Sequence, residues 1–328
     1  MPSRFVLTIA LLIALPAAAG EWIPTTLGTA KGLRNLVLDL TSGAVLIETA
    51  KGYLRVVDGK RLAAAPAPDR MLPKDAIPHS RAVKGTRDIA SAWLSDPTRR
   101  YGHGVLGDQI EAGSLSIRMA SGTVAKIILD EDSVFEDLMP RLHDLDGDGR
   151  DEVIVVRSYL VAGAAVAVFG LDGGKIVRRA ESPPIGQSHR WLCPVGMADF
   201  DGDGRIEIAV VETPHLGRTI VIYRQYGEKL VEVARQYGHS NHFIGSTVLD
   251  MSAVLDVDGD GIRDMVLPTG GRSRLVAMSF AGGKFKEIAR TPHGAEIVTA
   301  VIAADLDGNG TADLVYGRRD GRVELIRR

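Results

Sequence analysis

The stretch DLDGDGRDEVIVV, residues 144–156, places carboxylates at alternate positions directly before a continuous apolar run. Three later stretches have the same pattern: DFDGDGRIEIAVV from residue 199, DVDGDGIRDMVLP from residue 256 and DLDGNGTADLVYG from residue 305. Their first aspartates are 49 to 57 residues apart. Self-similarity at such a period is typical of repeat architectures, so we interpret the chain as a tandem array of one structural unit.

Each repeat contains enough strand-like sequence for four short β-strands. An apolar stretch ends at the first aspartate, and the acidic loop, a β-branched strand and a hairpin with glycine in its turn follow. The strand after the loop, such as VIVV at 153–156, does not alternate apolar with polar residues, which indicates burial on both faces. Blades stacked around the axis of a β-propeller are buried in this way. We therefore predict an all-β fold, a β-propeller of four-stranded blades.

Two more repeats without an acidic loop are expected nearer the N-terminus, because aspartates at the ends of apolar stretches continue the spacing. The six expected repeats lie around Asp39, Asp96, Asp144, Asp199, Asp256 and Asp305. The last repeat supplies only three strands, whereas EWIPTTL at 21–27 precedes the first repeat and has no blade of its own. We expect residues 21–27 to be the outer strand of the sixth blade, which closes the ring and removes a sheet edge.

Residues 1–19 have the pattern of a secretory signal peptide. Arg4 precedes the apolar run FVLTIALLIALP, and the small residues AAAG follow. The run is short for a membrane span, and an uncleaved anchor is the alternative interpretation. The prediction leaves one propeller domain over residues 20–328, located in the periplasm or secreted. The formal net charge is −2 and the Lys and Arg residues are scattered, so the chain lacks the basic surface expected of a nucleic-acid binder.

The acidic loops have the composition of a calcium site. Counted from the first aspartate, they read D-x-D-x-[DN]-G-x-x-[DE]. Side-chain oxygens at positions 1, 3, 5 and 9 and a backbone carbonyl at position 7 can surround one hard cation, while glycine at position 6 permits the sharp turn. One alternative is four solvated turns without metal, which carboxylate crowding disfavours. Another is an EF-hand, but its last acid stands at position 12 and leads into a helix.

About four calcium ions per chain are therefore expected, one for each loop. The expected ligands, with the residue that offers a backbone carbonyl in fourth place, are Asp144, Asp146, Asp148, Arg150 and Glu152; Asp199, Asp201, Asp203, Arg205 and Glu207; Asp256, Asp258, Asp260, Ile262 and Asp264; and Asp305, Asp307, Asn309, Thr311 and Asp313. The loop with Asn309 has one carboxylate fewer than the others, so we expect it to be the weakest site.

Loops of the type DxDGDG before a β-strand resemble the FG-GAP and VCBS repeats, which form calcium-binding β-propellers like that of the integrin α-subunit. The resemblance covers roughly residues 137–328, and the first two repeats join it only through their spacing. Phe169-Gly170 is the only Phe-Gly pair, and the tripeptide Gly-Ala-Pro is absent. The resemblance implies a fold and a metal, and it says little about a ligand.

Aromatic and polar side chains gather in the connections that enter repeats four to six. Because the metal loops join first and second strands, we expect these connections at the opposite end of the propeller, where a shallow platform could bind a glycan or peptide. The alternative is ordinary polar loops, with Trp191 packed between blades. A transition metal on His239 and His242 lacks a clear third ligand. The candidate ligand-binding residues are His189, Arg190, Trp191, Asn241, His242 and His293.

Two further features of the sequence are candidate sites. The segment TRRYGHGVLGD, residues 98–108, is expected on the metal-loop side of the second repeat. Its Arg100, His103 and Asp108 either form an anion or ligand site or replace the missing calcium loop with hydrogen bonds. Cys193 is the only cysteine and stands beside a proline, so we expect a buried, inert thiol.

The sequence contains no Ser-His-Asp order, G-x-S-x-G elbow, H-E-x-x-H helix or phosphate-binding glycine loop. The leading hypothesis is a non-catalytic, extracytoplasmic binding module that engages a protein or a polysaccharide. One alternative is a propeller enzyme, a hydrolase or lyase acting on an envelope or extracellular polymer, because propeller enzymes assemble sites from loops without a local motif. The other is an envelope scaffold without a small ligand.

Overall fold

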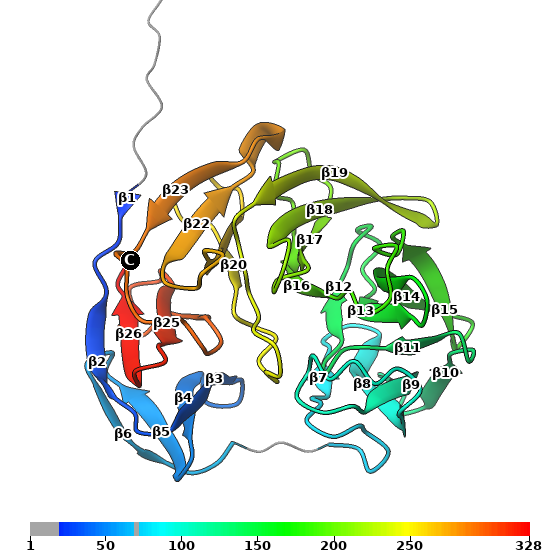
Figure 1. Cartoon of the computed structure of the whole chain (residues 1–328), viewed down its shortest axis with the longest axis horizontal. Helices are drawn as coiled ribbons and strands as arrows, with labels where there is room; N and C mark the ends of the chain where they lie inside the picture. Colours follow the sequence, from blue (N-terminus) through cyan, green and yellow to red (C-terminus); the bar gives the residue numbers. More distant parts are fainter. Residues whose placement is uncertain (1–19, 69–71) are drawn as a thin grey trace, which may run out of the picture.

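The computed structural model describes residues 20–68 and 72–328, so the expected signal peptide at 1–19 lies outside the described residues. The described chain is all-β, with 26 strands and a single 3-10 turn at Ala281–Gly283. The strands follow one another around the molecule in sequence order (Figure 1). No helix in residues 20–68 or 72–328 is long and apolar enough to cross a membrane.

Three of the sheets are small. One has the order β3 (Leu33–Asp39), β4 (Ala44–Thr49), β5 (Gly52–Val57), β6 (Arg61–Ala65). The second has the order β2 (Thr25–Thr29), β26 (Arg322–Ile326), β25 (Asp313–Gly317), β24 (Ile302–Ala304). The third has five strands in the order β1 (Gly20–Glu21), β23 (Lys286–Arg290), β22 (Leu275–Ser279), β21 (Asp264–Pro268), β20 (Ala253–Leu255).

The remaining 13 strands form one continuous sheet. Its path runs β16 (Leu192–Ala198), β17 (Glu207–Glu212), β18 (Thr219–Tyr226), β19 (Lys229–Tyr237), β15 (Lys175–Glu181), β14 (Gly163–Asp172), β13 (Glu152–Tyr159), β11 (Ser133–Phe135), β9 (Glu111–Met119), β8 (Ile89–Thr98), β7 (Val83–Lys84), with β10 (Val124–Ile128) on β9 and β12 (Arg141–His143) on β13. Two links in this path are single residue pairs, Glu181 with Lys229 and Phe135 with Ala112. The sheet is therefore continuous only through thin connections.

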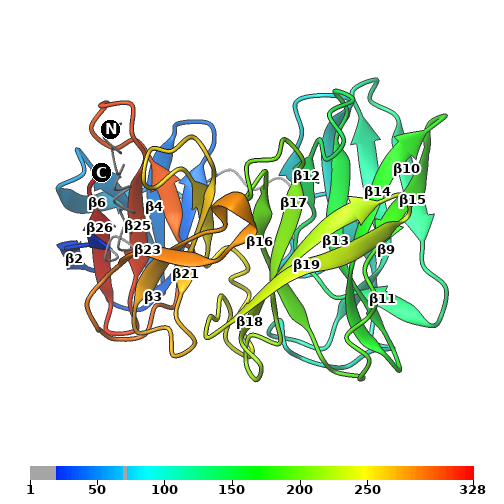
Figure 2. The same ribbon diagram turned by 90° about the horizontal axis from the view of Figure 1, so that it is seen from above.

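Strand β2, near the N-terminus, lies beside β26, the last strand of the chain. Strand β2 pairs antiparallel with β26, from Thr25 opposite Leu325 to Thr29 opposite Arg322, and it is the outermost strand of its sheet. Both views show this neighbourhood (Figures 1 and 2). The pairing is the one expected for residues 21–27, with one difference. Gly20 and Glu21 pair with β23 of the neighbouring sheet instead, so the N-terminal segment spans two sheets.

The strands that follow the acidic loops are buried on both faces, as their apolar runs predict. Every residue of β21 and β25 is buried, and in β13 and β17 only the last residue is partly exposed. Side chains of successive sheets pack together: Ala209 and Ile220 share one apolar cluster with Met265. Burying apolar surface on both faces of a sheet supplies most of the stability of such a core.

The register expected for the second repeat is wrong. Asp96 was expected to end a first strand, as Asp144 does, but it lies within β8, which pairs with β7 on one side and β9 on the other. The turn that corresponds to the acidic loop is 85–88, between β7 and β8. Asp88 in this turn accepts a hydrogen bond from the Asp151 N–H at 2.9 Å, which places it beside the first acidic loop.

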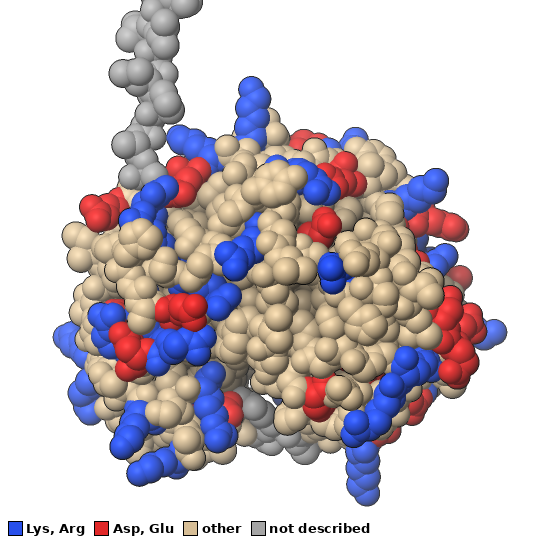
Figure 3. Space-filling model, in the orientation of Figure 1, with Lys and Arg blue, Asp and Glu red and all other residues tan. Residues whose placement is uncertain are grey.

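Charges on the face shown in Figure 3 are mixed. Lys and Arg are interspersed with Asp and Glu, mainly toward the edges of this face, and much of the surface between them carries neither sign (Figure 3). This distribution agrees with the balanced composition of 39 basic and 41 acidic residues.

Candidate metal loops and histidine pocket

Each acidic loop is held in the same turn by its first aspartate. Asp144 accepts hydrogen bonds from the N–H groups of Gly147 at 2.8 Å and Gly149 at 3.0 Å. The same two contacts recur at the first aspartates of the other three loops. Gly147 and Gly149 have φ of 78° and 85°, a region that favours glycine because it has no Cβ. The D-x-D-G-D-G spacing therefore specifies the turn locally.

The acid at position 9 fastens each of three loops to the strand that follows. One carboxylate oxygen of Glu152 accepts the Leu145 N–H at 2.9 Å, and Asp264 accepts the Val257 N–H at 2.8 Å. Glu207 makes the same contact with the residue after its first aspartate. The second oxygen of Asp264, Oδ1, is buried without a hydrogen-bond partner among the described residues. A buried carboxylate oxygen without a partner is costly, and a cation would satisfy it.

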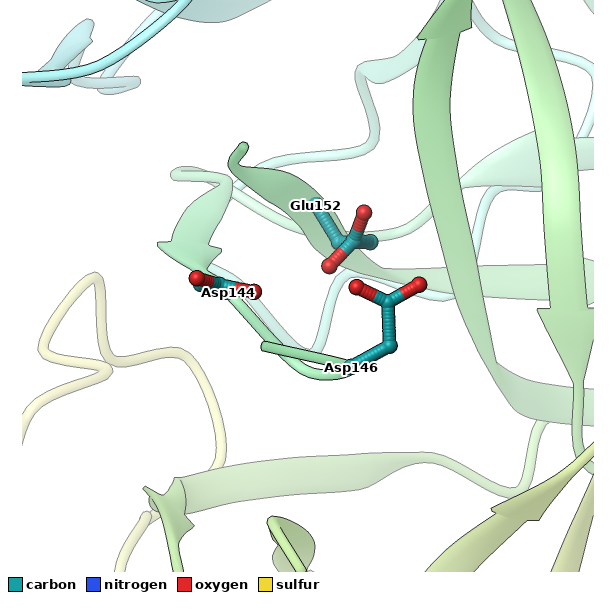
Figure 4. Close-up of side chains that lie close together, drawn as sticks. All are labelled: Asp144, Asp146 and Glu152. Atoms are coloured by element: carbon teal, nitrogen blue, oxygen red, sulfur yellow. The ribbon is translucent and has the colours of Figure 1, made fainter. Parts of the chain in front are cut away.

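Carboxylate oxygens converge in three of the four loops. The groups whose oxygens lie within 4.8 Å of one another are Asp144, Asp146 and Glu152; Asp199, Asp201 and Asp203; and Asp256, Asp258 and Asp260. In the first loop, the side chains of Asp146 and Glu152 point toward each other with Asp144 alongside (Figure 4). In the last loop position 5 is an amide, and the Asn309 oxygen accepts the Thr311 N–H at 2.7 Å.

The electrostatics of these loops favour a bound cation. Burial, reinforced by the neighbouring aspartates, raises the pKa of Glu152 to about 7. The same causes raise the pKa of Asp264 to about 6. Since oxygen-only ligand sets with flexible geometry suit calcium, the residues fit this ion. A bound calcium ion would neutralise the carboxylates and tie each loop to the strand after it.

A second candidate site lies at the other end of the strands. Strands β13, β14 and β15 are antiparallel in turn, so the chain leaves β15 at the end away from loop 144–151. A cavity of about 250 Å³ opens at this end. Its lining residues are His103, Val105, His189, Arg190, Trp191, Thr213, His215, Leu216 and Ile244. We refer to it as the histidine pocket.

The segment 98–108 lies at the histidine pocket and not on the metal-loop side, which corrects the sequence prediction. The rings of Tyr101 and His189 stack with centroids 4.8 Å apart, and the Tyr101 hydroxyl accepts the His189 N–H at 2.7 Å. His103 approaches His189 edge-on at 5.1 Å. His189 has φ of 57°, an uncommon value for a residue with a side chain, and such backbone strain often occurs at functional sites.

Trp191 forms the wall of the pocket and is not a rim residue. It is 2% exposed, and its indole N–H donates to the Glu136 carbonyl oxygen at 2.9 Å. Its ring meets the His242 ring with centroids 4.7 Å apart. Trp191 is therefore a packed, buried residue, in agreement with the alternative interpretation given for it above.

Hydrogen bonds fix the protons on the His215 imidazole, which lines the pocket, and on the His242 imidazole behind it. His242 Nε2 lies 2.9 Å from the Ser246 carbonyl oxygen, so it must donate. The other nitrogen of neutral His242 then accepts from His215 Nε2, which is 2.9 Å away. Burial lowers the pKa of His242 to about 3 and that of His215 to about 4, so both rings are neutral at pH 7. His215 Nδ1 is left with a lone pair.

The His189 imidazole also has one nitrogen that is free to accept a hydrogen bond. The Ser188 hydroxyl donates its one proton to the Leu160 carbonyl oxygen at 2.6 Å, so it accepts from His189 Nδ1 at 2.7 Å. His189 Nε2 therefore carries a lone pair, and burial lowers the pKa of this residue. Two residues that line the pocket, His189 and His215, can thus each accept a hydrogen bond from a ligand.

One buried acid, Glu136, contacts the third imidazole of the pocket, that of His103, and a second buried acid, Glu111, interacts with Glu136. His103 Nδ1 lies 2.6 Å from Glu136 Oε1, and Ser158 donates to the other Glu136 oxygen. Burial raises the pKa of Glu136 to about 8. It also raises the pKa of Glu111 to about 9, assisted by the charge of Glu136. Neither carboxylate oxygen of Glu111 has a hydrogen-bond partner among the described residues.

The other sequence candidates lie apart from the pocket lining. Asn241 and His242 are fully buried, and the Asn241 amide donates to the Pro194 carbonyl oxygen at 3.1 Å. His293 is exposed and contacts Ser273. Arg100 donates to the Ser133 carbonyl oxygen, and an Asp108 oxygen accepts the Ile110 N–H, so both order their own connections.

Cys193 is buried, as the sequence predicts, and burial raises the pKa of its thiol. His215 and Glu136 were not among the sequence candidates. His215 lies in a connection between the second and third strands of its repeat, and no local pattern distinguishes it.

The fold and the loops define an all-β repeat protein with acidic turns that can hold a hard cation. The profile of the FG-GAP-like repeat matches residues 144–210 and 256–316, so the chain contains FG-GAP-like repeats in these two places. No curated protein has a significant match to the chain. Among solved structures, a chain of the Photorhabdus luminescens Tc holotoxin pore is similar, with 13% identity and a TM-score of 0.43. That match covers 94% of this chain and 14% of the toxin chain.

Proposed function

We propose that the protein is a six-bladed, calcium-stabilised β-propeller that acts in the periplasm or outside the cell as a non-catalytic binding module. The partner is a protein or a polysaccharide. Six blades are supported by the pairing pattern: consecutive strands form groups of four, and the long sheet holds together between such groups only by short pairings. In this proposal β2 supplies the outer strand of the sixth blade.

Calcium in the acidic loops would stabilise this ring. The loop carboxylates converge, and the buried Asp264 Oδ1 has no protein partner among the described residues. Because an ion that binds only the folded chain adds to stability by mass action, the loops would link folding to extracellular calcium. The metal and the partner are then handled at opposite ends of the strands.

The observation that carries the binding proposal is the convergence of His103, His189 and His215 on one pocket. Since His189 and His215 present lone pairs, the pocket suits a ligand with hydroxyl or amide N–H donors, such as sugar hydroxyls or a peptide backbone. Leu216 and Ile244 at the pocket are 66% and 70% exposed, which adds apolar surface for the partner.

The test is capture of defined envelope polysaccharides and, separately, of envelope proteins by the immobilised chain. His189→Ala and His215→Ala should each reduce capture at least tenfold, because removing a hydrogen-bond acceptor leaves a ligand donor unpaired. His293→Ala is the matched control, since His293 is exposed and does not line the pocket. Equal capture by all three variants and the unchanged chain would contradict the proposed face.

The contact between His103 and Glu136 favours one second candidate, a hydrolase or lyase acting on an envelope polymer. A histidine held by a buried glutamic acid side chain at a pocket has the arrangement of a general acid or base. The proposal predicts release of new chain ends from such a polymer, with loss of this activity in His103→Gln. Binding without any release of chain ends by the unchanged protein would leave the binding module as the function.

A further inference from the structure

The four acidic loops differ in the residue that faces their position-9 acid across the sheet. Glu207 on β17 pairs with Arg224 on β18. In the last loop the register places Arg327 opposite Asp313, next to the pair Leu314 and Ile326. Extending the registers of β13 with β14 and of β21 with β22 by one residue places Gly170 opposite Glu152 and Ser279 opposite Asp264. Two loops therefore face an arginine, and two face a small residue.

Arg224 contacts three of the four acids of its loop. Its guanidinium lies 2.7 Å from Asp201, 3.1 Å from Asp203 and 2.5 Å from Glu207. These carboxylates stand at loop positions 3, 5 and 9. The Arg224 side chain is only 12% exposed, so these contacts are partly shielded from water. The Glu207 oxygen that Arg224 contacts, Oε1, is the one that the Phe200 N–H does not use.

Arg327 makes the corresponding contacts in the last loop. Its Nη1 lies 2.6 Å from Asp313 and 3.1 Å from Asp307, at loop positions 9 and 3. Its other terminal nitrogen donates to the Gly59 carbonyl oxygen at 2.9 Å, which anchors the guanidinium. The other Asp313 oxygen accepts the Arg328 N–H. Both oxygens of the position-9 acid are thus used within the protein.

The two other loops lack this guanidinium. Among the residues that the structure describes, no Lys or Arg forms an ion pair with the four acids of the Asp256 loop, and Arg328 contacts only its backbone carbonyls. In the Asp144 loop, Arg87 approaches Asp144 at 3.6 Å from a neighbouring turn, but its 3.0 Å contact is with Asp151, outside the ligand positions. Glu152 faces Gly170, which has no side chain to contact it.

We propose that Arg224 and Arg327 are built-in counter-ions that compete with calcium for the Asp199 and Asp305 loops. A guanidinium that contacts the position-3 and position-9 carboxylates uses oxygens that a calcium ion needs, and its positive charge repels the ion. The chain then has two tight calcium sites, at the Asp144 and Asp256 loops, and two weak ones. The weak pair keeps its shape without calcium and fills only at higher concentration. This inference rests on the calcium proposal above.

The test is calcium titration of the full mature chain by calorimetry, with exchange variants. Ser279 faces Asp264 in a loop that we expect to bind calcium tightly. Arg224→Ser and Arg327→Ser therefore place the same residue type opposite the position-9 acids of the two arginine-facing loops. Each change should convert one weak site into a tight one, with a gain of roughly tenfold or more in affinity, since a nearby like charge is removed. Ser279→Arg should weaken one tight site by a similar factor.

Melting curves separate the counter-ion role from a general loss of packing. In chelator, Arg224→Ser should melt below the unchanged chain, because the carboxylates lose their counter-ion, and calcium should close most of this gap. An equal loss with and without calcium would contradict the counter-ion role. Four equal sites that Arg224→Ser leaves unchanged or weakens would overturn this inference but leave the calcium proposal standing. No calcium bound by any variant would overturn both.

Discussion

Replacing Trp191 by alanine tests whether the wall of the histidine pocket belongs to the core. The side chain is 2% exposed and packs against His242, so truncation leaves a large cavity. Such substitutions cost about 3–5 kcal/mol of the free energy of unfolding. The Glu136 carbonyl oxygen also loses its indole donor, which adds about 1–3 kcal/mol if no water replaces it. We therefore expect a loss of at least about 3 kcal/mol.

The assay is urea unfolding followed by tryptophan-independent circular dichroism, with calcium held constant. His293→Ala is the control, because an exposed side chain with one serine contact should change stability by no more than about 0.5 kcal/mol. A loss below about 1 kcal/mol for Trp191→Ala would refute the buried position. Trp191 would then be available to contact a ligand, as the sequence analysis suggested.

Two further predictions concern closure and pH. Deleting residues 20–29 removes the strand paired with β26 and exposes a sheet edge. The deletion should lower the melting temperature or cause aggregation. An unchanged melting temperature would contradict the proposed closure by β2. Burial raises the pKa of Glu111 from 4.5 to about 9. Between these pH values the folded chain keeps a proton that the unfolded chain releases. The free energy of unfolding should therefore fall as the pH rises through this range. Glu111→Gln should reduce this fall in urea unfolding at about pH 5 and pH 9, and an identical fall in both proteins would contradict the assignment.

The acidic loops could be predicted because their structure is local. Asp144 binds the N–H groups of residues three and five positions later, and glycine supplies the positive φ that the turn needs. The spacing of these residues in the sequence therefore determines the conformation of the turn. The buried strands were equally readable, because burial on both faces leaves a continuous apolar run.

The register of the second repeat and the histidine pocket could not be predicted in this way. The second repeat has no acidic loop to mark its first strand, and Asp96, which follows an apolar stretch as Asp144 does, lies within the second strand instead. His103, His189 and His215 come from three separate connections, and only the arrangement of the sheets brings them to one cavity. Trp191 has the same sequence context whether it lies at a rim or in a wall. Its burial depends on Glu136 and His242, which are distant in sequence.

The roles of Arg224 and Arg327 also depend on long-range register. Each arginine lies 14 or more residues beyond the acid it faces, and a shift of one residue would turn its side chain to the other face of the sheet. The acidic pattern alone therefore predicts four similar sites. The cross-strand partners divide them into two pairs.

The most direct test of the calcium assignment is the melting temperature of the mature chain in chelator and in calcium. An ion present at about 100 times its dissociation constant adds about 2.7 kcal/mol per site. Two tight sites would then raise the melting temperature by about 8 °C for a chain of this size. We predict a rise of this order, saturating as the tight sites fill. Identical melting curves in chelator and in millimolar calcium would contradict the assignment.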